Sequence, residues 1–339
     1  MLENFFREKN KRRYAGYALT ALVLLCIPLV ITNGYHIRVI NFIIIYCIIS
    51  VSINLIGGYG GQLAMGHACY VGVAAYATAI LGVSYGWPFW ITFPVSILLA
   101  TIYGFLTAIV CVGRIRGDYV MIVTMGVSEI TRIFFINAVS LTGGPMGIPQ
   151  VPGITIFSFA FTSSKQYYYL FLIFLLFTIF VIRSIVYSKF GRAIVAIRED
   201  EVAAKAMGIQ VNWTKIITFT ISAAFAGLAG ALLAHYNRFV GPMQFDLDEG
   251  LLYFQMIIIG GLGSISGSIL GAAILVLIPE LFRGIAEYRT IFYGLIMVIM
   301  MVVKPQGLLG NVGSDHVVVR FGNAIKRSVT RLFKHKGAE

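Results

Sequence analysis

The feature that most constrains this chain is a series of apolar segments, each about as long as a lipid bilayer is thick. A helix needs roughly 20 apolar residues to cross the hydrocarbon core of a membrane. Segments of this kind recur along the sequence at 14–31, 37–56, 64–82, 89–113, 119–137, 168–186, 214–236, 250–262, 265–282 and 286–303. The two on either side of residue 263 are short or interrupted by glycine. The pattern predicts an all-α, polytopic integral membrane bundle of about ten transmembrane segments with broken helices.

The composition supports a lipid environment. Only 12% of the 339 residues are charged and 58% are hydrophobic, whereas a typical soluble chain is about a quarter charged. A net charge of +12 raises the question of nucleic acid. However, the lysines and arginines gather at both ends of the chain and in short connectors. That distribution is typical of cytoplasmic anchoring and argues against a nucleic-acid partner.

The same basic residues predict an orientation. The basic stretch 1–13 precedes the apolar run 14–31, which we interpret as an uncleaved first transmembrane helix because no small-residue cleavage site closes it. With the N-terminus inside, an even number of crossings places the basic connectors and the basic tail 305–339 in the cytoplasm. These connectors carry Arg114, Arg116, Lys189, Arg192, Arg198, Lys205 and Lys215. The opposite connectors, 83–88, 138–167 and 237–249, hold only Lys165 and Arg238. We therefore expect a transmembrane domain over 14–304 with both termini cytoplasmic.

Motifs for chemistry are missing from the sequence. It contains no G-x-x-x-x-G-K-[ST] phosphate loop, no H-E-x-x-H and no Ser/His/Asp set placed for nucleophilic catalysis. Its cysteines stand singly in or beside apolar runs, without a C-x-x-C spacing, and suit packing roles: Cys26, Cys47, Cys69 and Cys111. We predict that this chain is not an enzyme and holds no catalytic residue, metal or cofactor.

The largest polar segment before the tail is 188–213. Within it, 192–207 lacks glycine and proline and is rich in helix formers. Glu201 and Lys205 have the spacing of an i,i+4 ion pair, and Gly208 suits the end of a helix. The segment is therefore expected to form a short cytoplasmic helix, either as a functional element or as an ordinary solvated connector.

Two glycine-rich stretches interrupt the apolar pattern. The first, GGYGGQLAMGHACY at 57–70, joins two apolar runs without any charge, and the second is GGLG at 260–263. Glycine permits irregular backbone, and transporters place such breaks at solute sites. We favour simple turns and close helix packing as the explanation, with lining of a solute pathway as the alternative. The candidate pathway residues are Asn54, Gly57, Gly58, Gly60, Gln62, His67, Gly260 and Gly261. A lone histidine such as His67 also suits a satisfied interior position.

One pair of charged residues lies inside an apolar run. Glu129 and Arg132 are spaced i,i+3 within 119–137, so they can pair along one helix face. Ionisable residues are costly in a membrane and often functional. The pair is interpreted as structural, facing a partner protein, with a proton relay as the alternative.

The polar segment also resembles a known motif. The pattern E-x-A-A-x-x-x-G, formed here by Glu201, Ala203, Ala204 and Gly208, is similar to the EAA loop of ABC importer permeases. Further similar stretches are INLIGGYGGQLAMGHACYVGVAAYATA at 53–79, TGGPMGI at 142–148, ISAAFAGLAGALLA at 221–234 and IIGGLGSISGSILGAAIL at 258–275. Together they resemble the permeases for high-affinity branched-chain amino acid uptake, in particular the LivM-type subunit, over roughly residues 40–310.

This resemblance implies a function. The chain would be a permease of an ATP-driven importer in a bacterial cytoplasmic membrane, paired with a homologous H-type permease, two cytoplasmic ATPase subunits that bind ATP and magnesium, and an extracytoplasmic amino acid-binding protein. Its coupling helix would dock in a groove of the ATPase through Glu199, Asp200, Glu201, Ala203, Ala204 and Gly208. The outer stretches 141–153 and 244–249 would face the binding protein.

Two alternatives remain open from the sequence. Related permeases that carry urea, short amides or other amino acids share these motifs. A secondary transporter driven by an ion gradient, with Glu129 as the coupling group, is the alternative from another class.

Overall fold

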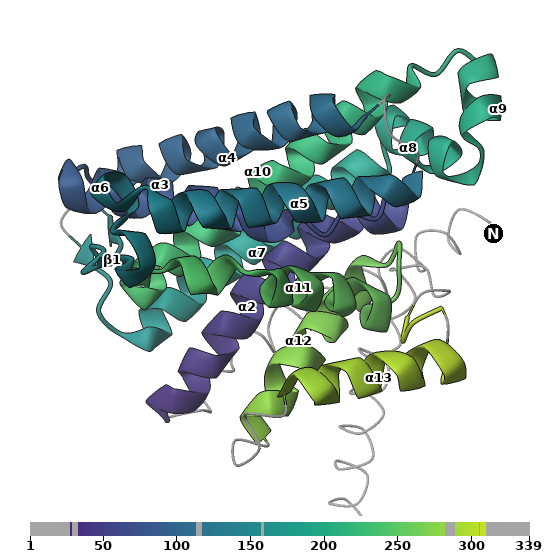
Figure 1. Ribbon diagram of the computed structural model, residues 1–339. Coiled ribbons are helices and arrows are strands. Elements are labelled where there is room, and N and C mark those ends of the chain that lie inside the picture. The colour runs from purple at the N-terminus through teal and green to yellow at the C-terminus, as the bar shows by residue number, and fades with distance from the viewer. Residues whose placement is uncertain are drawn as a thin grey trace, which may run out of the picture.

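The computed structural model describes residues 28, 33–112, 117–156, 159–281, 289–304 and 306–309. In this part of the chain, six helical stretches are long and apolar enough to cross a membrane: Gly34–Tyr59, His67–Ser84, Phe89–Cys111, Tyr119–Asn137, Ser164–Val186 and Val211–Asn237. They contain α2 (Gly34–Asn54), α3 (His67–Ala79), α4 (Phe89–Cys111), α5 (Gly117–Asn137), α7 (Ser164–Val186) and α10 (Val211–Asn237). The expected all-α, multi-pass architecture is confirmed (Figure 1).

The expected count of about ten crossings is not reached in the described part of the chain. The last three apolar segments form shorter helices: α11 (Leu247–Gly260), α12 (Ile265–Leu281) and α13 (Arg289–Val303). With 14 residues, α11 is about 21 Å long, well short of the roughly 30 Å hydrocarbon core. It ends early because Gly261 adopts φ 117. The basic N-terminus 1–13, the expected first span apart from residue 28, and the basic tail from residue 310 lie outside the described residues.

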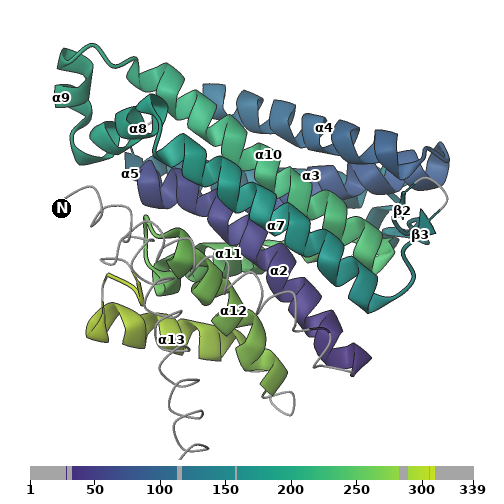
Figure 2. The ribbon, with the colours of Figure 1, turned by 180° about the vertical axis from the view of Figure 1, so that it is seen from behind.

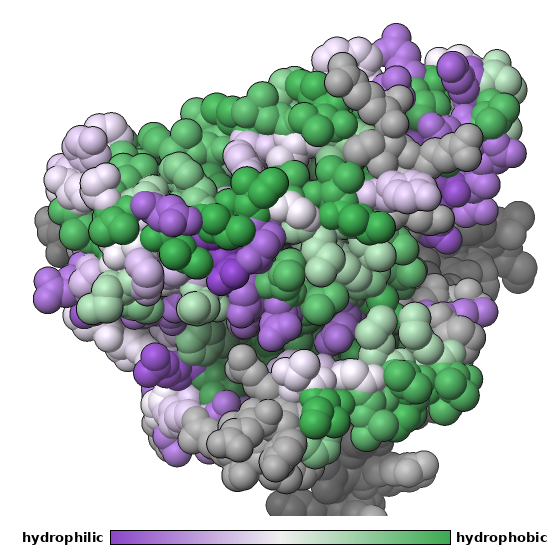
Figure 3. All heavy atoms as spheres, in the orientation of Figure 1, coloured by the Kyte–Doolittle hydropathy of each residue, from purple (hydrophilic) through white to green (hydrophobic). Residues whose placement is uncertain are grey.

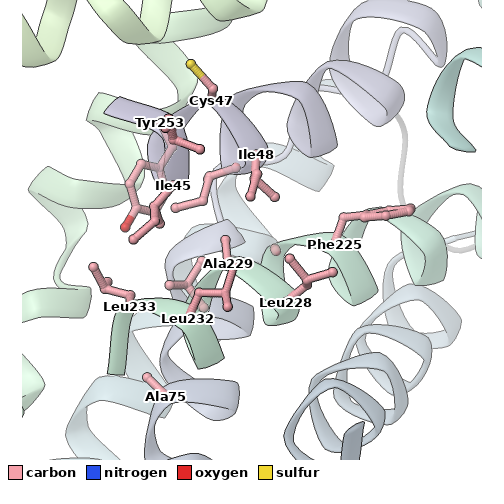
Figure 4. Packing of buried hydrophobic residues seen from close by; sticks show 14 of the residues in the cluster. Ile45, Cys47, Ile48, Ala75, Phe225, Leu228, Ala229, Leu232, Leu233 and Tyr253 are labelled. Atoms are coloured by element: carbon pink, nitrogen blue, oxygen red, sulfur yellow. The ribbon is translucent and has the colours of Figure 1, made fainter. Parts of the chain in front are cut away.

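The core of the bundle lies around α2, α3 and α10. Buried residues make up 72%, 67% and 72% of the membrane-length windows of these helices, against 28% for each of α4, α5 and α7. Figure 4 shows Ile48 of α2 close to Leu228 and Ala229 of α10 within this core. The outer helices expose mainly apolar side chains, as the green surface over α4 and α5 shows (Figure 3). Such faces suit contact with lipid.

Small residues let α10 approach its neighbours closely. A Cβ added at Gly227 would lie 2.5 Å from the Cβ of Ala100 on α4, and one added at Gly230 would overlap the carbonyl oxygen of Val71 on α3. Gly104 of α4 likewise has no room for a side chain beside Ala223. The small-residue run 221–234 is therefore explained by helix packing, which in membranes relies on such close contacts.

The two ends of the bundle differ. One end carries α8 (Lys189–Glu199) and α9 (Glu201–Ala206), which extend beyond the long helices (Figures 1 and 2); we call it the α8–α9 end. The other, the loop end, carries the short elements α6 (Val139–Thr142), β1 (Ile148–Pro149), β2 (Thr155–Ile156), β3 (Phe159–Ala160) and β4 (Phe239–Val240) and the 3₁₀ turns Gly144–Met146 and Pro242–Phe245. Strand β1 pairs antiparallel with β4, and β2 with β3.

The close contact of α10 with α3 yields a first prediction. Replacing Gly230 by alanine forces the two helices apart, because the new methyl group overlaps the Val71 carbonyl. Overpacking of this kind costs about 1–3 kcal/mol. Gly126→Ala on α5 is the matched control, since nothing lies within 4 Å of its added Cβ. We expect Gly230→Ala to lower the Tm of the purified protein and Gly126→Ala to leave it equal or higher; equal Tm values for both variants would contradict the packing role.

Candidate coupling segment and glycine junction

The polar segment forms two helices instead of the single expected one. Helix α8 ends at Glu199, and Asp200 interrupts the helical conformation with φ −155 and ψ 111. The Asp200 carboxylate accepts hydrogen bonds from the backbone N–H groups of Val202 and Ala203, at 2.8 and 2.9 Å, and so caps α9. Aspartate favours this N-cap position over a helix interior. The prediction of one continuous helix over 192–207 was therefore wrong at Asp200.

Helix α9 is fixed to the bundle by a small contact. Ala204 is buried against Ile197 of α8 and Val211 of α10. Glu201 forms an ion pair with Lys215 of α10, with Oε2 and Nζ 2.6 Å apart. The i,i+4 pair expected between Glu201 and Lys205 is thus replaced by a contact between helices. Gly208 follows α9 with φ +84, which confirms its predicted place at the end of the helix.

The outward side of α9 exposes apolar side chains. Val202 is 78% exposed and Met207 is 83% exposed. The charged residues Glu199 and Asp200 are exposed beside them, as are the small residues Ala203 and Gly208. The hydrophilic surface at the top right of Figure 3 covers this α8–α9 region. Large apolar side chains on a polar projection mark a surface suited to a protein partner.

The first glycine stretch forms the irregular backbone that the sequence predicts. Helix α2 continues into a π-helical turn, Leu55–Tyr59, and the chain turns at Gly61 with φ +66 before α3 begins at His67. A Cβ at Gly60 would lie 2.6 Å from the Ile56 carbonyl oxygen. Both the conformation at Gly61 and the crowding at Gly60 therefore require glycine.

The second glycine stretch closes the connection between α11 and α12. Gly261 and Gly263 adopt φ 117 and +77. Gly260 packs directly on the backbone of Gly267, so α11 and α12 lie side by side at this point. The chain after α13 supplies hydrogen-bond donors to the end of α11. The N–H groups of Leu308 and Leu309 donate to the carbonyls of Ile259 and Gly260 at 2.9 and 3.0 Å.

These two stretches, 57–61 and 260–263, meet in space, and we call their contact the glycine junction. The side-chain Oδ1 of Asn54 accepts a hydrogen bond from the Gly263 N–H at 2.9 Å. A Cβ at Gly58 would overlap both Asn54 Oδ1 and the Gly263 nitrogen. Asn54 is fully buried. In this conformation it therefore connects the two breaks and does not line an open passage.

The remaining polar candidates lie apart from one another. Gln62 is buried beside a small, shallow hollow lined by Gly60, Gln62, Ile194, Ile197, Thr214, Lys215 and Thr218. Gly57 packs near Ile257 of α11, 3.0 Å from its added Cβ. Of the predicted pathway residues, Gly58, Asn54 and the second glycine stretch come together, whereas Gln62 faces α8 and α10.

His67 is buried in the interior, where its Nε2 has a hydrogen-bond partner and its Nδ1 has none among the described residues. Its Nε2 lies 2.7 Å from the Ser222 hydroxyl, which itself donates to the Ser52 carbonyl at 2.7 Å. Because the hydroxyl proton is already used, Nε2 is the donor to Ser222. The histidine thus links α3, α10 and α2. Among the described residues no three His, Cys, Asp or Glu side chains are grouped to hold a metal.

Glu129 and Arg132 form the expected i,i+3 pair on α5. The Arg132 Nε lies 3.0 Å from both carboxylate oxygens of Glu129, and both side chains are partly exposed. Arg132 also approaches the sulfur of Met243, at 3.9 Å, in the 3₁₀ turn of the loop end. The carboxylate is therefore bound by its guanidinium neighbour and is not a free group.

The predicted outer stretches share the loop end. In 141–153, the glycines Gly143, Gly144 and Gly147 have positive φ, and Ile148 pairs with Val240 of β4. In 244–249, the Asp246 carboxylate caps α11 by accepting from the Glu249 N–H at 3.0 Å. The stretches before α7 and after α10 are thus joined into one surface opposite α8 and α9.

Arg198 is the contact that sequence reasoning missed. It lies in the last turn of α8, and its Nη1 donates a hydrogen bond to the Gly58 carbonyl at 2.8 Å. From the sequence alone, Arg198 is one of several basic residues in a connector. Since its partner lies 140 residues earlier in the chain, no local pattern indicates the contact.

A bundle of membrane-length helices with broken helices and a projecting polar helix pair is an arrangement that suits a membrane transport subunit. The sequence matches, over residues 35–303, the family described as the permease component of branched-chain amino acid transport systems. This chain belongs to that family.

Individual proteins described as branched-chain amino acid permeases are also similar to this chain. The chain is 36% identical over 316 residues to the high-affinity branched-chain amino acid transport permease LivM of Escherichia coli (strain K12), covering 86% of this chain and 74% of that protein. It is 27% identical over 287 residues to LivH of the same organism, covering 78% and 91%. A probable LivM of Methanocaldococcus jannaschii is 25% identical over 236 residues, covering 63% and 67%. No solved structure matches the chain.

The buried bond between Asn54 and Gly263 yields the second prediction. Asn54→Ala leaves the Gly263 N–H without its acceptor, and an unsatisfied buried donor costs about 1–3 kcal/mol. Asn137→Ala is the matched control, because Asn137 is exposed and bonds only within its own helix, to the Ile133 carbonyl. Thermal unfolding of the purified variants should show a lower Tm for Asn54→Ala alone. A Tm equal to that of the unsubstituted protein would show that the bond between Asn54 and Gly263 does not stabilise the junction.

Proposed function

We propose that this chain is the permease subunit of an ATP-driven ABC importer that carries branched-chain amino acids across the cytoplasmic membrane. Membership in the permease family supports this function. The observation that carries the coupling role is helix α9, which projects from the bundle and exposes Val202 and Met207. Exposed apolar side chains on a polar end suit contact with a partner protein.

The proposal includes the partners of this subunit. A homologous H-type permease would complete the passage, two ATPase subunits would bind ATP and magnesium, and an extracytoplasmic amino acid-binding protein would deliver the solute. The similarity of the chain to both LivM and LivH supports a pair of related permeases. The binding protein would dock on the loop end, at 141–153 and 244–249, and the ATPase on α9.

The proposed orientation follows from the distribution of charge. The polar segment 188–213 would be the cytoplasmic coupling loop of a transmembrane domain over 14–304, together with basic cytoplasmic termini at 1–13 and 305–339. The loop end would then face outward. Closure of the ATPase subunits would move α8 and α9, and the bundle would switch which side of the membrane has access to the solute.

A gradient-driven transporter is the weaker alternative. Its coupling group would be Glu129, but both oxygens of that carboxylate are bound by Arg132. The chain can be reconstituted alone and given a proton gradient. Accumulation of solute without ATPase subunits would overturn the importer proposal. Uptake assays with leucine, isoleucine, valine, urea and short amides would identify the solute class.

The exposed apolar pair on α9 gives the third prediction. Replacing Val202 and Met207 together by serine should leave the fold intact, because both side chains are exposed and such surface changes cost about 0.5 kcal/mol or less. If they are anchors in the ATPase groove, their loss weakens docking at least about tenfold. We expect ATPase co-purification and ATP-driven uptake to fall together.

The control for this experiment is Met146→Ser. Met146 is as exposed as Met207, at 83%, but lies at the loop end. It should keep full ATPase co-purification. Wild-type co-purification by the Val202/Met207 double variant would show that α9 does not dock through these side chains.

The ion pair of α9 gives the fourth prediction. Glu201→Lys places two ammonium groups where Glu201 and Lys215 now meet, so α9 should shift away from α10. The Glu201 side chain is 54% exposed and that of Lys215 is 16% exposed, so the pair lies at the surface, where such pairs contribute about 1 kcal/mol or less to stability, and the chain should still insert. Uptake and ATPase co-purification should be lost in Glu201→Lys and restored by the charge-reversed double variant Glu201→Lys/Lys215→Glu. Unchanged uptake in the single variant would contradict the coupling role of α9.

A further inference from the structure

We propose that Arg198 is the positioning residue through which the α8–α9 pair acts on the glycine junction. This inference rests on the proposed function and deepens it, because it names the contact that connects the ATPase-facing helices to the breaks in the transmembrane helices. Arg198 does not touch the solute in this role. It acts through Gly58, whose backbone it holds.

The first supporting observation is the hydrogen bond itself. Arg198 Nη1 donates to the Gly58 carbonyl at 2.8 Å, across two segments that are otherwise distant in the chain. Gly58 lies in the π-helical turn at the end of α2, where the regular helical pattern of hydrogen bonds is interrupted. A charged donor to such a carbonyl forms a stronger bond than a neutral one.

The second observation is the fit of the arginine side chain against glycine. A Cβ added at Gly61 would lie 2.7 Å from Arg198 Cγ and 3.2 Å from its Cβ. A Cβ added at Gly263 would lie 3.4 Å from Arg198 Nη1. The stem and the head of the side chain therefore lie in space left by glycines of both breaks. A shift of α8 therefore acts on both glycine stretches at the same time.

The third observation is the connection beyond Gly58. Gly58 has no room for a side chain because Asn54 and the Gly263 backbone lie against it, and Asn54 bonds Gly263. Movement of the Gly58 backbone therefore reaches the turn between α11 and α12. The contacts form a continuous series from α8 through the end of α2 to the start of α12. Packed chains of this kind transmit displacement between elements.

The fourth observation concerns the other basic residues of the segment. Lys215, just after the segment, is paired with Glu201, and Arg192 contacts the Tyr187 carbonyl, at 3.5 Å, next to its own helix. Arg198 also lies near its neighbour Glu199, with Nε and Oε1 3.7 Å apart. In the described part of the chain, Arg198 is the basic residue of this segment that donates a hydrogen bond to the glycine junction. Its side chain is 41% exposed, so the contact can break and form again during a transport cycle.

The test uses the full complex, with both permeases, the ATPase subunits and the binding protein, reconstituted in vesicles. Three variants are compared with the unsubstituted complex: Arg198→Ala, Arg198→Lys and the control Arg192→Ala. ATP hydrolysis and leucine uptake are measured on the same vesicles.

For Arg198→Ala we expect normal co-purification and ATP hydrolysis, but at least a tenfold fall in solute carried per ATP. Arg198→Lys should recover part of this ratio, because an ammonium group can still donate to the Gly58 carbonyl. Arg192→Ala should leave the ratio unchanged.

A second substitution approaches the same contact from the glycine side. Gly61→Ala places a methyl group against Arg198 Cγ and should displace the side chain, lowering solute carried per ATP as Arg198→Ala does. Gly86→Ala is the matched control, since Gly86 has nearly the same φ, +64 against +66, and nothing lies within 4 Å of its added Cβ. The Arg198→Ala/Gly61→Ala double variant should carry as much solute per ATP as either single variant, because both substitutions remove the same interaction.

Each outcome decides the proposal. An unchanged transport ratio in Arg198→Ala would overturn it, and so would loss of ATPase co-purification, which would make Arg198 a docking residue. A fall in the ratio for Gly86→Ala equal to that of Gly61→Ala would assign the effect to backbone strain and also overturn it. If the unsubstituted complex shows no ATP-driven uptake of leucine, the proposed function fails first, independently of Arg198.

Discussion

Irregular backbone among packed helices needs hydrogen-bond partners from its own chain, and the glycine junction depends on that constraint. A peptide group left without a partner away from water is costly. Here the Gly263 N–H is bound by Asn54, the Gly58 carbonyl by Arg198, and the Ile259 carbonyl by the backbone of Leu308. These partners come from α2, from α8 and from the chain after α13. Satisfying the broken backbone therefore joins the polar segment to both interrupted helices, and the coupling segment and the junction form one structural unit.

The central helix α10 connects this unit to the rest of the bundle. It begins at Val211, in the last residues of the polar segment, and its first turns carry the Lys215 partner of α9. Further along, Gly227 and Gly230 bring it into backbone contact with α4 and α3. Close packing through small residues makes this part of the bundle stiff, since there is little side chain to yield. A displacement of α9 thus acts at one end of a helix that is firmly packed over its remaining length.

Most of the long helices could be predicted from the sequence, because length and apolarity alone define a crossing. The same rule failed after residue 247, where the backbone conformation at Gly261 limits α11 to 14 residues. Within the polar segment, the helix end at Gly208 followed from glycine chemistry, whereas the break at Asp200 was missed because helix formers surround it. The partner of Glu201 was also missed. Helical spacing favours Lys205, but the folded chain brings Lys215 of α10 to 2.6 Å from the Glu201 carboxylate, a contact between helices that local spacing does not indicate.

The glycine breaks show where local reasoning ends. Their irregular backbone was predictable, but the contact of Asn54 with Gly263 spans 209 residues, and that of Arg198 with Gly58 spans 140. Each glycine is required for its own reason. Gly58 gives room to the Gly263 backbone, Gly61 combines a positive φ with the stem of Arg198, and Gly263 turns the chain into α12. Contacts within the chain thus account for these glycines without a bound solute. A solute passage lined by Gln62 remains a separate prediction, since Gln62 lies beside the hollow between the first break, α8 and α10.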